Sequence, residues 1–308
     1  MKIKKIIVLG SCNTDMVIQT DRLPVPGETI LGGDFMMTPG GKGANQAVAI
    51  SRLGGSVTFI TKTGNDVFGR QSIELYQDEG IETDHVFCDL GHPSGVALIT
   101  VDKDAENCIV VASGANKTLS KEDIEKCRAE IERADILLMQ FEVPLDIVEY
   151  AAEIAYEAGV KVIINPAPAV SISDSLFKKT SIIIPNMTEA EIISGVKVTD
   201  WDSAKKAADR IMEKGVETVI ITLGSLGALL KTGDTCHEIP VDRKVKAVDT
   251  TAAGDTFCGA FCVAISENTS LVDAVRFANR AAGISVTKMG AQISIPYRRQ
   301  LEGLLSNA

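Results

Sequence analysis

Residues 136–164 read ILLMQFEVPLDIVEYAAEIAYEAGVKVII, and this segment decides the fold class. Two short apolar runs, 136–139 and 160–164, flank an amphipathic stretch at 145–157 that ends just before Gly159. Short continuous apolar runs are typical of buried strands, and an amphipathic stretch that stops at a glycine is typical of a helix. The segment therefore predicts a strand, a helix and a second strand, which is the repeating unit of a parallel sheet.

The same alternation continues along the rest of the chain. Further apolar runs predict buried strands at 6–9, 57–61, 182–184 and 218–222. Amphipathic stretches predict helices at 44–53, 68–79, 120–131, 188–194, 203–214, 256–266 and 271–286. Because such alternation builds a largely parallel sheet, we expect one α/β domain over residues 1–308. The sheet would be doubly wound, with helices on both faces and ligands beyond the carboxyl ends of its strands.

Two segments, 15–38 and 86–111, interrupt this alternation. The first is rich in glycine and proline, and the second carries strand-like runs such as Val96–Val101. We expect both to form short antiparallel strands of one small β-sheet, which covers the ligand site as a lid and also serves as a dimer surface. Two unrelated surface hairpins are the alternative, since loop excursions are common.

Composition and charge narrow the class of protein. The chain has 308 residues, 45% of them hydrophobic, and a net charge of −10 at pH 7. This acidity argues against a nucleic-acid-binding surface, which needs a basic face. No apolar run approaches the length of a membrane span, and the run after Lys2–Lys5 is too short for an export signal. Seven cysteines and three histidines without metal-like spacing favour a cytoplasmic protein with reduced thiols and no structural zinc site.

The sequence VDTTAAGDTF at residues 248–257 predicts an anion site at the start of a helix. The small residues Ala252, Ala253 and Gly254 would let backbone N–H groups point at an anion, which the positive end of the helix also attracts. Asp255 would lie in the first turn, where its carboxylate could take a proton from a hydroxyl that attacks a bound phosphate. The alternative is an aspartate that only stabilises the helix start.

A second glycine-rich stretch, PGGKGANQ at 39–46, opens another predicted helix. Its spacing is not that of a P-loop, and no dinucleotide-binding fingerprint follows the first strand. Glycines such as Gly41 and Gly43 would let the backbone approach a small polar ligand, whose hydroxyls Lys42 and Asn45 could bind. A tight turn with a solvated lysine is the alternative.

Polar residues also follow several predicted strands, where parallel sheets build ligand sites. Asn13 and Asp15 follow the first strand, and an amide beside a carboxylate suits a vicinal diol, although an Asx turn has the same pattern. Later strands are followed by Glu142, Asn165, Asn186 and Thr222–Ser225. Asn186 and Glu189 stand three residues apart at a helix entrance, where they could hold Mg²⁺ through water.

Five motifs occur in the order seen in the PfkB-type carbohydrate kinases, and the chain resembles that family from Ile6 to about Pro296. The motifs are GSCNTD at 10–15, GGKGANQ at 40–46, NPAP at 165–168, NMTE at 186–189 and DTTAAGDTF at 249–257. Within the family, the chain is most similar to the kinases that act on ribose. The resemblance implies a doubly wound α/β domain, a β lid that pairs subunits into a homodimer, and transfer of the γ-phosphoryl group of ATP to the 5-hydroxyl of D-ribose with Mg²⁺.

The resemblance also implies roles for individual residues. Asp255 matches the catalytic base, beside the anion loop of Ala252, Ala253 and Gly254. Sugar-binding positions match Asn13, Asp15, Gly41, Lys42, Gly43, Asn45 and Glu142. Nucleotide-binding positions match Asn186, Thr222, Gly224, Ser225, Gly227, Gly254 and Asn279. A monovalent-cation site, usually for K⁺, matches Asp249, Thr251, Ser285, Lys288, Gly290 and Ser294.

Two positions depart from the family pattern. Met187 stands where many members carry a second acidic residue, so contacts to magnesium or phosphate there would be weaker. Ala252 replaces a glycine common in the wider family and favours ribose over fructose or a nucleoside as the substrate. The alternatives are a sibling kinase acting on deoxyribose, fructose or a nucleoside, a non-catalytic sugar-binding regulatory protein, and a dehydrogenase, which the missing fingerprint disfavours.

Overall fold

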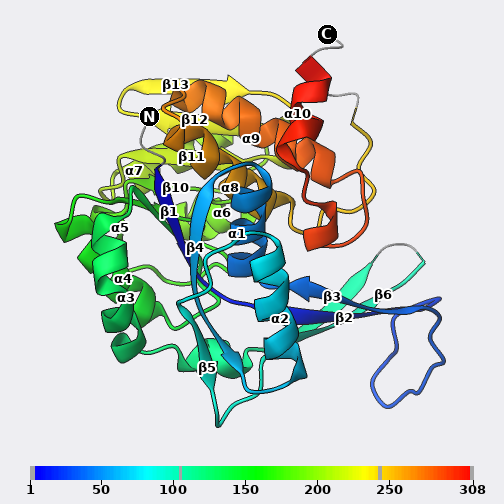
Figure 1. Ribbon diagram of the computed structural model, residues 1–308. Helices are drawn as coiled ribbons and strands as arrows, with labels where there is room; N and C mark the ends of the chain where they lie inside the picture. Colours follow the sequence, from blue (N-terminus) through cyan, green and yellow to red (C-terminus); the bar gives the residue numbers. More distant parts are fainter. Residues whose placement is uncertain (1–3, 104–105, 242–244, 306–308) are drawn as a thin grey trace.

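The computed structural model describes residues 4–103, 106–241 and 245–305, and a large sheet forms its centre (Figure 1). Within this part of the chain the sheet has nine strands in the order β13-β12-β11-β10-β9-β8-β1-β4-β5. The strands are β1 (Lys5–Leu9), β4 (Ser56–Gly64), β5 (Val86–Asp89), β8 (Ile136–Met139), β9 (Lys161–Ile164), β10 (Ile182–Ile183), β11 (Thr218–Thr222), β12 (Ala228–Thr232) and β13 (Thr235–Ile239). Neighbouring strands from β11 to β5 are parallel, whereas β12 is antiparallel to both of its neighbours. The predicted α/β fold with a mostly parallel sheet is confirmed.

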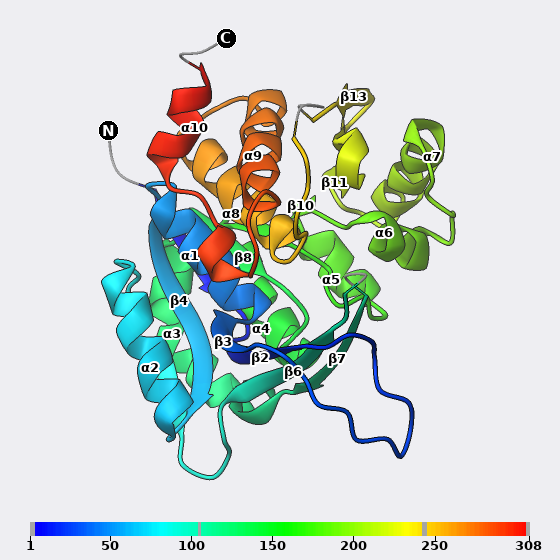
Figure 2. The same cartoon turned by 90° about the vertical axis from the view of Figure 1, so that its right-hand side faces the viewer.

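Helices cover both faces of the large sheet (Figures 1 and 2). They are α1 (Lys42–Arg52), α2 (Val67–Asp78), α3 (Lys121–Arg133), α4 (Leu145–Glu157), α5 (Asp174–Lys179), α6 (Met187–Ser194), α7 (Trp201–Met212), α8 (Ala253–Ser266), α9 (Leu271–Ser285) and α10 (Arg298–Leu305). Successive residues of a strand face opposite sides, so Ile6 and Val8 of β1 join one buried cluster with α1, α8 and α9. Ile7 and Leu9 join a second cluster with α3, α4 and α7. In the described ranges, no helix has the length and apolarity needed to cross a membrane.

Most predicted elements match the observed ones. The strands at 136–139 and 218–222 and the helix at 145–157 have the predicted bounds. Helix α8 begins at Ala253, before the predicted start, because Ala252 adopts a left-handed backbone conformation and turns the chain into the helix. The sequence pattern does not predict the β12–β13 hairpin, because β13 is mostly exposed and lacks an apolar run.

Strand β1 lies where the strand order of the large sheet reverses. After β1 the chain adds β4 and β5 on one side, and later β8 to β11 on the other. The loops that leave the carboxyl ends of β1 and β8 therefore diverge and open a crevice, which is where such sheets bind ligands. These loops carry Gly10–Cys12 and Gln140–Glu142.

A small sheet with the strand order β3-β2-β6-β7 projects beside this crevice (Figure 1). Its strands are β2 (Asn13–Gln19), β3 (Phe35–Gly40), β6 (Gly95–Val101) and β7 (Asn107–Ala112). The pairs β2–β3 and β6–β7 are antiparallel, as expected, and a parallel β2–β6 pair joins them into one sheet instead of two unrelated hairpins. The strand β5, at the start of the predicted segment 86–111, belongs instead to the large sheet, because it continues the parallel pairing of β4.

Helix α1 starts in close contact with the loop that leaves β1. Ala44 N donates to Ser11 O at 2.9 Å, which draws the two segments together. A Cβ atom on Gly43 would lie 2.6 Å from the carbonyl carbon of Gly10 and 2.7 Å from its Cα. Glycine at position 43 is therefore needed for the start of α1 to reach the crevice.

We expect Gly43→Ala to lower the free energy of unfolding by about 1–3 kcal/mol, because the added methyl group overpacks a backbone crossing. Gly283→Ala in α9 is the matched control, since its Cβ would meet only Val245 Cγ2, at 3.8 Å. There, alanine should raise the free energy of unfolding by about 0.5–1 kcal/mol through helix propensity. Urea unfolding of both variants measures these values, and equal stability of the two variants would contradict the packing argument.

Candidate active site

Asp255 lies in the first turn of α8 and is only 6% exposed. Asn45 Nδ2 donates to Asp255 Oδ2 at 2.9 Å, and Gln46 Nε2 donates to Asp255 Oδ1 at 3.0 Å. Both donors belong to α1, at the other end of the sequence. The N-cap of α8 is Ala252, so the Asp255 side chain does not cap its own helix. Its carboxylate is held by a different helix, unlike an aspartate that only stabilises a helix start.

The start of α8 has the features of an anion site. Ala252 has a φ of 57°, and Ala253 N donates to Thr250 O at 3.2 Å in the turn that precedes the helix. The first turn of a helix leaves N–H groups without acceptors from within the helix and carries partial positive charge. A Cβ atom on Gly254 would meet nothing within 4 Å, so the space beside this turn is open. The turn can therefore admit a phosphate group next to Asp255.

Glu142 joins the loop after β8 to the start of α1. Its Oε2 accepts from Ser11 Oγ at 2.5 Å and from Lys42 N at 3.0 Å. The backbone at Gly41 has a φ of +89°, and a Cβ there would lie 2.8 Å from Asn13 N. The sequence analysis did not single out Ser11, although its place directly after β1 at the reversal of the sheet is a signal that could have found it.

Asn13 and Asp15 alternate along β2, so both side chains lie on one face of the small sheet. Asn13 Oδ1 accepts from Asn116 Nδ2 at 2.8 Å, and Asn116 in turn bonds to the backbone N and O of Cys12. A Cβ on Gly40 would lie 2.2 Å from Asp15 Oδ2, so a side chain there would displace the carboxylate. The buried Asn116 is a second residue that the sequence analysis did not identify, since no motif contains it.

The site holds several interacting charges. The pKa of Asp15 is raised to about 6, first by burial and then by the carboxylates of Glu142 and Asp255, while Lys42 opposes these effects. Burial also raises the pKa of Asp255, against the effect of Lys42 and of the two amide donors. Asp255 in turn raises the pKa of Lys42, which stays charged. Carboxylates accept hydrogen bonds, so this half of the site suits a neutral ligand rich in hydroxyl groups.

The residues predicted to bind a nucleotide lie along the adjacent strand ends. Asn186 and Thr222 form an isolated parallel bridge between the loops after β10 and β11. Asn186 Oδ1 accepts from Glu189 N, and Glu189 Oε2 accepts from Asn186 N, both at 2.8 Å. This reciprocal cap fixes the start of α6. Met187 packs its partly buried side chain against the core, so the missing second acid is replaced by an apolar contact.

Gly227 and Asn279 approach the same backbone carbonyl. A Cβ on Gly227 would lie 2.1 Å from Ile239 O, and Asn279 Nδ2 donates to that oxygen at 3.0 Å. Gly224–Leu226 form a single 3₁₀ turn, in which Ser225 is exposed. The structure thus brings the loop after β11 beside α9. One amide N–H of Asn279 is used in the hydrogen bond to Ile239 O of β13.

The six residues predicted to hold a monovalent cation come from two neighbouring segments. Asp249 Oδ1 accepts from Thr251 N at 2.8 Å, and Asp249 Oδ2 accepts from Gly290 N at 2.8 Å. Val248 N donates to Val286 O at 2.7 Å, which places Ser285 near the same loop. Lys288 and Ser294 lie in the segment that carries Gly290, where Ser294 Oγ donates to Ala291 O at 2.7 Å.

Two buried glutamines complete the surroundings of Asp255 and were not among the predicted site residues. Gln140 Nε2 donates to Gln46 Oε1 at 2.6 Å, and Gln46 Nε2 also donates to Asn165 Oδ1 at 3.0 Å. Gln46 stands inside the glycine-rich motif, and Gln140 directly follows β8. The position of each residue in the sequence is therefore a signal that could have identified it as part of the site. Asn165, a strand-end residue in the sequence analysis, joins this network.

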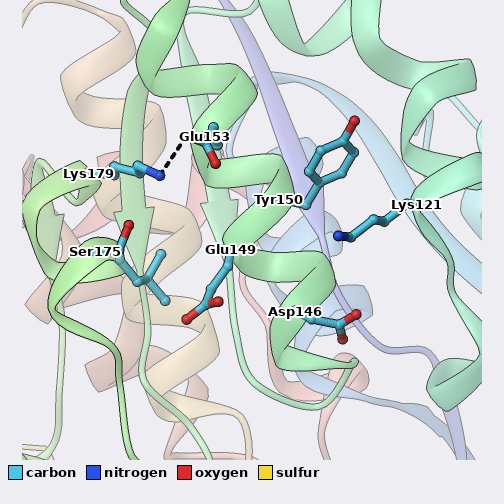
Figure 3. A pocket seen from close by; sticks show the side chains of 8 residues that line it. Lys121, Asp146, Glu149, Tyr150, Glu153, Ser175 and Lys179 are labelled. Carbon is cyan, nitrogen blue, oxygen red and sulfur yellow. Dashed lines mark ion pairs between the residues drawn. The ribbon is translucent and has the colours of Figure 1, made fainter.

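A separate surface cavity lies between α3, α4 and α5 (Figure 3). It is lined by charged and polar side chains that include Lys121, Glu149 and Ser175, and Lys179 Nζ lies 2.9 Å from Glu153 Oε1. Its lining contains none of the residues that meet at Asp255.

Comparison with known proteins gives one consistent result. A model of the pfkB family of carbohydrate kinases matches residues 3–298. A ribokinase of Haemophilus influenzae is 48% identical over 305 residues, which cover 99% of this chain and 99% of the relative. A deoxyribokinase of Salmonella typhi is 37% identical over 302 residues and covers 98% of each chain. The solved structure of Arabidopsis thaliana ribokinase complexed with ribose and ATP has a TM-score of 0.91 and 32% identity, with 99% of each chain covered.

The matched family model spans the motifs that meet around Asp255, from the loop after β1 to the first turn of α8. The chain belongs to the pfkB family of carbohydrate kinases.

Proposed function

We propose that the protein transfers the γ-phosphoryl group of ATP to the 5-hydroxyl of D-ribose, giving ribose 5-phosphate and ADP. The observation that carries this proposal is the position of Asp255, which is buried between hydroxyl-binding side chains and the open first turn of α8. The Haemophilus relative is named a ribokinase, and the Arabidopsis neighbour was solved with ribose and ATP, so both support this choice of substrates.

The sugar would occupy the half of the site lined by α1, β2 and the loop after β8. Within the described residues, Asn45 Oδ1 is buried and has no hydrogen-bond partner, so it can accept from a sugar hydroxyl. We assign the other hydroxyl contacts to Asn13, Asp15, Lys42 and Glu142. Gly41 and Gly43 let the start of α1 pack against the backbone of the loop after β1, which holds this half of the site together.

Phosphoryl transfer depends on positioning and on charge stabilisation more than on covalent chemistry. Asp255 takes the proton of the 5-hydroxyl as its oxygen forms a bond to the γ-phosphorus. The bond from that phosphorus to the oxygen bridging the β-phosphate breaks, and ADP leaves with the electron pair. The turn Ala252–Gly254 stabilises the negative charge on the transferring group through the positive end of α8 and the N–H groups that this turn leaves unbonded, whereas Ala253 N donates to Thr250 O.

The nucleotide would lie along the loops after β10 and β11, with its phosphates directed at the start of α8. We assign its contacts to Asn186, Gly254, Asn279 and the loop Thr222–Gly227, including Gly224 and Ser225. The shared approach of Gly227 and Asn279 to Ile239 supports a ligand surface between this loop and α9.

Magnesium fits beside Glu189. This carboxylate is buried and interacts electrostatically with Lys42 and Asp255, so it faces the same site, and burial raises its pKa. Its Oε2 already accepts from Asn186 N, which favours contact with Mg²⁺ through water over direct coordination. Mg²⁺ keeps several waters and neutralises phosphate charge when it is bound with ATP.

Potassium fits the loop formed by residues 249–251 and 285–294. Its proposed ligands, Asp249, Thr251, Ser285, Lys288, Gly290 and Ser294, offer side-chain or backbone oxygens, which hard cations prefer. The hydrogen bonds that Asp249 accepts from Thr251 N and Gly290 N support the proposal, because they already join the two segments next to the anion loop. A bound cation would stiffen the turn that leads into Ala252.

The small sheet would act as a lid and as a homodimer surface. Its inner face carries Asn13 and Asp15. From the strand pairing, its outer face carries the apolar side chains of Met16, Ile18, Phe35, Met37, Leu98 and Val110, with Thr14 and Thr100 on the same face. Ile18, Phe35, Met37, Leu98 and Val110 are 40–63% exposed, which is unusual for such a contiguous apolar set and favours pairing with a second copy.

Deoxyribose is the second candidate substrate, because the Salmonella relative is named a deoxyribokinase. A contact from Asn13 or Asp15 to the 2-hydroxyl would disfavour it, since the buried polar group would be left unpaired. A non-catalytic sugar-binding protein is less well supported, because it would not need Asp255 beside an open anion site.

All seven cysteines are free thiols, which fits the reducing cytoplasm proposed for the chain.

Release of ADP in the presence of each of several sugars tests the function. We expect ribose to support turnover, at a higher rate with potassium than without it. Asp255→Asn should lower kcat by about 10²–10⁴-fold, because the base is lost, while ATP binding is retained. Asp234→Asn, in the exposed turn between β12 and β13, is the matched control and should leave kcat unchanged. Wild-type turnover in Asp255→Asn would rule out the base, and turnover with another sugar alone would rule out ribose.

Asp15→Asn should make the ligand-free protein more stable at pH 8 and raise KM for ribose. Because the folded-state pKa of Asp15 is raised from 3.8 to about 6, the wild-type protein loses stability as pH rises through that interval. Asparagine does not titrate, so the gain should be near zero at pH 4 and about 1–2 kcal/mol at pH 8. Urea unfolding at both pH values measures it, and an equal gain at both would contradict the assigned cause.

Met37→Glu together with Val110→Glu should convert a homodimer into a monomer, because two charges would be placed on the outer face of the small sheet. Ile109→Glu is the matched control, since Ile109 is 51% exposed but lies on the opposite face of β7. Light scattering gives the mass of each protein. A monomeric wild-type protein at micromolar concentration would contradict the proposed dimer.

A further inference from the structure

Gln46 is fully buried, and each of its polar atoms has a partner. Its Nε2 donates to Asp255 Oδ1 at 3.0 Å and to Asn165 Oδ1 at 3.0 Å. Its Oε1 accepts from Gln140 Nε2 at 2.6 Å. An amide nitrogen has two N–H donors, so the two Nε2 bonds use both. A fully bonded buried amide has one orientation, because rotation would break all three bonds at once.

The polarity of this network is set by a backbone carbonyl. Asn165 Nδ2 donates to Ile184 O at 3.0 Å, and a carbonyl can only accept. Asn165 Oδ1 must therefore face Gln46 and accept a hydrogen bond, and the donor must be the amide nitrogen of Gln46. The Gln46 oxygen is thereby turned toward Gln140, whose nitrogen must donate. Each amide in the series has its orientation fixed by the one before it.

Gln140 is also held sterically. Its Oε1 would lie only 2.0 Å from a Cβ on Gly10, so the amide packs against bare backbone where the chain leaves β1. Gln140 is 0% exposed, like Gln46. The network is thus anchored by Ile184 O, directly after β10, and by Gly10, directly after β1. The second N–H of Gln46 Nε2 points at Asp255.

We propose that Gln46, with its orientation locked by Asn165 and Gln140, is a positioning residue that keeps Asp255 ionised and fixes the direction of its carboxylate. The proposal rests on the role of Asp255 in the proposed function. A donor that cannot turn its oxygen toward Asp255 favours the charged carboxylate over the protonated acid. It thereby opposes the effect of burial and leaves the base able to accept the hydroxyl proton.

Asn45, the other donor to Asp255, has a different role in this arrangement. Its Oδ1 has no partner among the described residues and is free for the sugar, whereas Gln46 has no free polar atom. Loss of Asn45 should therefore affect sugar binding directly. Loss of Gln46 should affect the ionisation of Asp255. It should change KM for ribose by less than about threefold, because Gln46 makes no contact with the sugar in this proposal.

The test compares pH profiles of Gln46→Met, Gln46→Glu and the wild-type protein. Removal of a hydrogen bond to a charged group should lower kcat at pH 7 about 10- to 100-fold and move the acid limb of kcat/KM about one to two pH units higher. Gln46→Glu should move the limb at least as far, because it places a second acid beside Asp255. Turnover of Gln46→Met should recover as pH rises, which a merely misfolded site would not show.

Gln140→Met should give a smaller shift of the acid limb in the same direction. It removes the hydrogen bond that fixes the orientation of Gln46, but it leaves the Gln46 N–H that donates to Asp255. Gln71→Met, on the exposed side of α2, is the matched control and should leave the profile unchanged. A loss of turnover that is equal at every pH, or an acid limb that does not move in Gln46→Met, would overturn the proposal.

A ¹³C NMR titration of the Asp255 carboxyl carbon in the ligand-free protein gives a second readout that does not need turnover. We expect the midpoint to lie higher in Gln46→Met than in the wild-type protein. An unchanged midpoint would overturn the proposal. Failure of the proposed function would look different, because the wild-type protein would then show no ribose-dependent ADP release while the NMR midpoints still differed.

Discussion

The burial of one carboxylate, Asp255, is the constraint that joins the two ends of this chain. An ionised carboxylate taken out of water is costly unless donors surround it, and here the donors come from α1. Helix α1 can reach α8 because Gly43 lets it cross the loop after β1 closely and because Gly259 of α8 leaves room for Gln46 O and Ala49 of α1. The glycine-rich motif and the late aspartate motif are therefore two halves of one hydrogen-bonded unit.

The layers of the fold could be predicted because buried strands and amphipathic helices have different apolar periods. Ile136–Met139 and Leu145–Glu157 were assigned correctly for that reason. The sheet to which β5 belongs could not be predicted, since its pairing partner β4 is far away in the sequence. The hairpin β12–β13 pairs strands that are close in the sequence, and it was missed for a different reason. A strand with an exposed pattern such as β13 gives no local signal at all.

The candidate site was predicted unevenly for a related physical reason. Residues at strand ends and in glycine-rich turns are the ones that motif and spacing single out, which is why Asn13, Asp15 and Asp255 were proposed from the sequence. Gln46, Gln140 and Asn116 support those residues from within the core. A polar residue is normally taken as exposed, and only the fold reveals that these three are buried and that each hydrogen-bonds to another buried residue of the site.

The division of charge in the site is consistent with the proposal that backbone amides bind the phosphate. A cationic side chain pressed against Asp255 would stabilise its carboxylate so well that it would become a weak base. The first turn of α8 instead offers partial positive charge spread over several N–H groups, and the charged Lys42 interacts with Asp15 and Glu142 as well as with Asp255. Lys42 and the two neutral amide donors oppose the effect of burial on Asp255, and burial still keeps its pKa above the ordinary value, which preserves its affinity for a proton. A buried base held by amides is in this sense better suited to accept a hydroxyl proton than one held by a salt bridge.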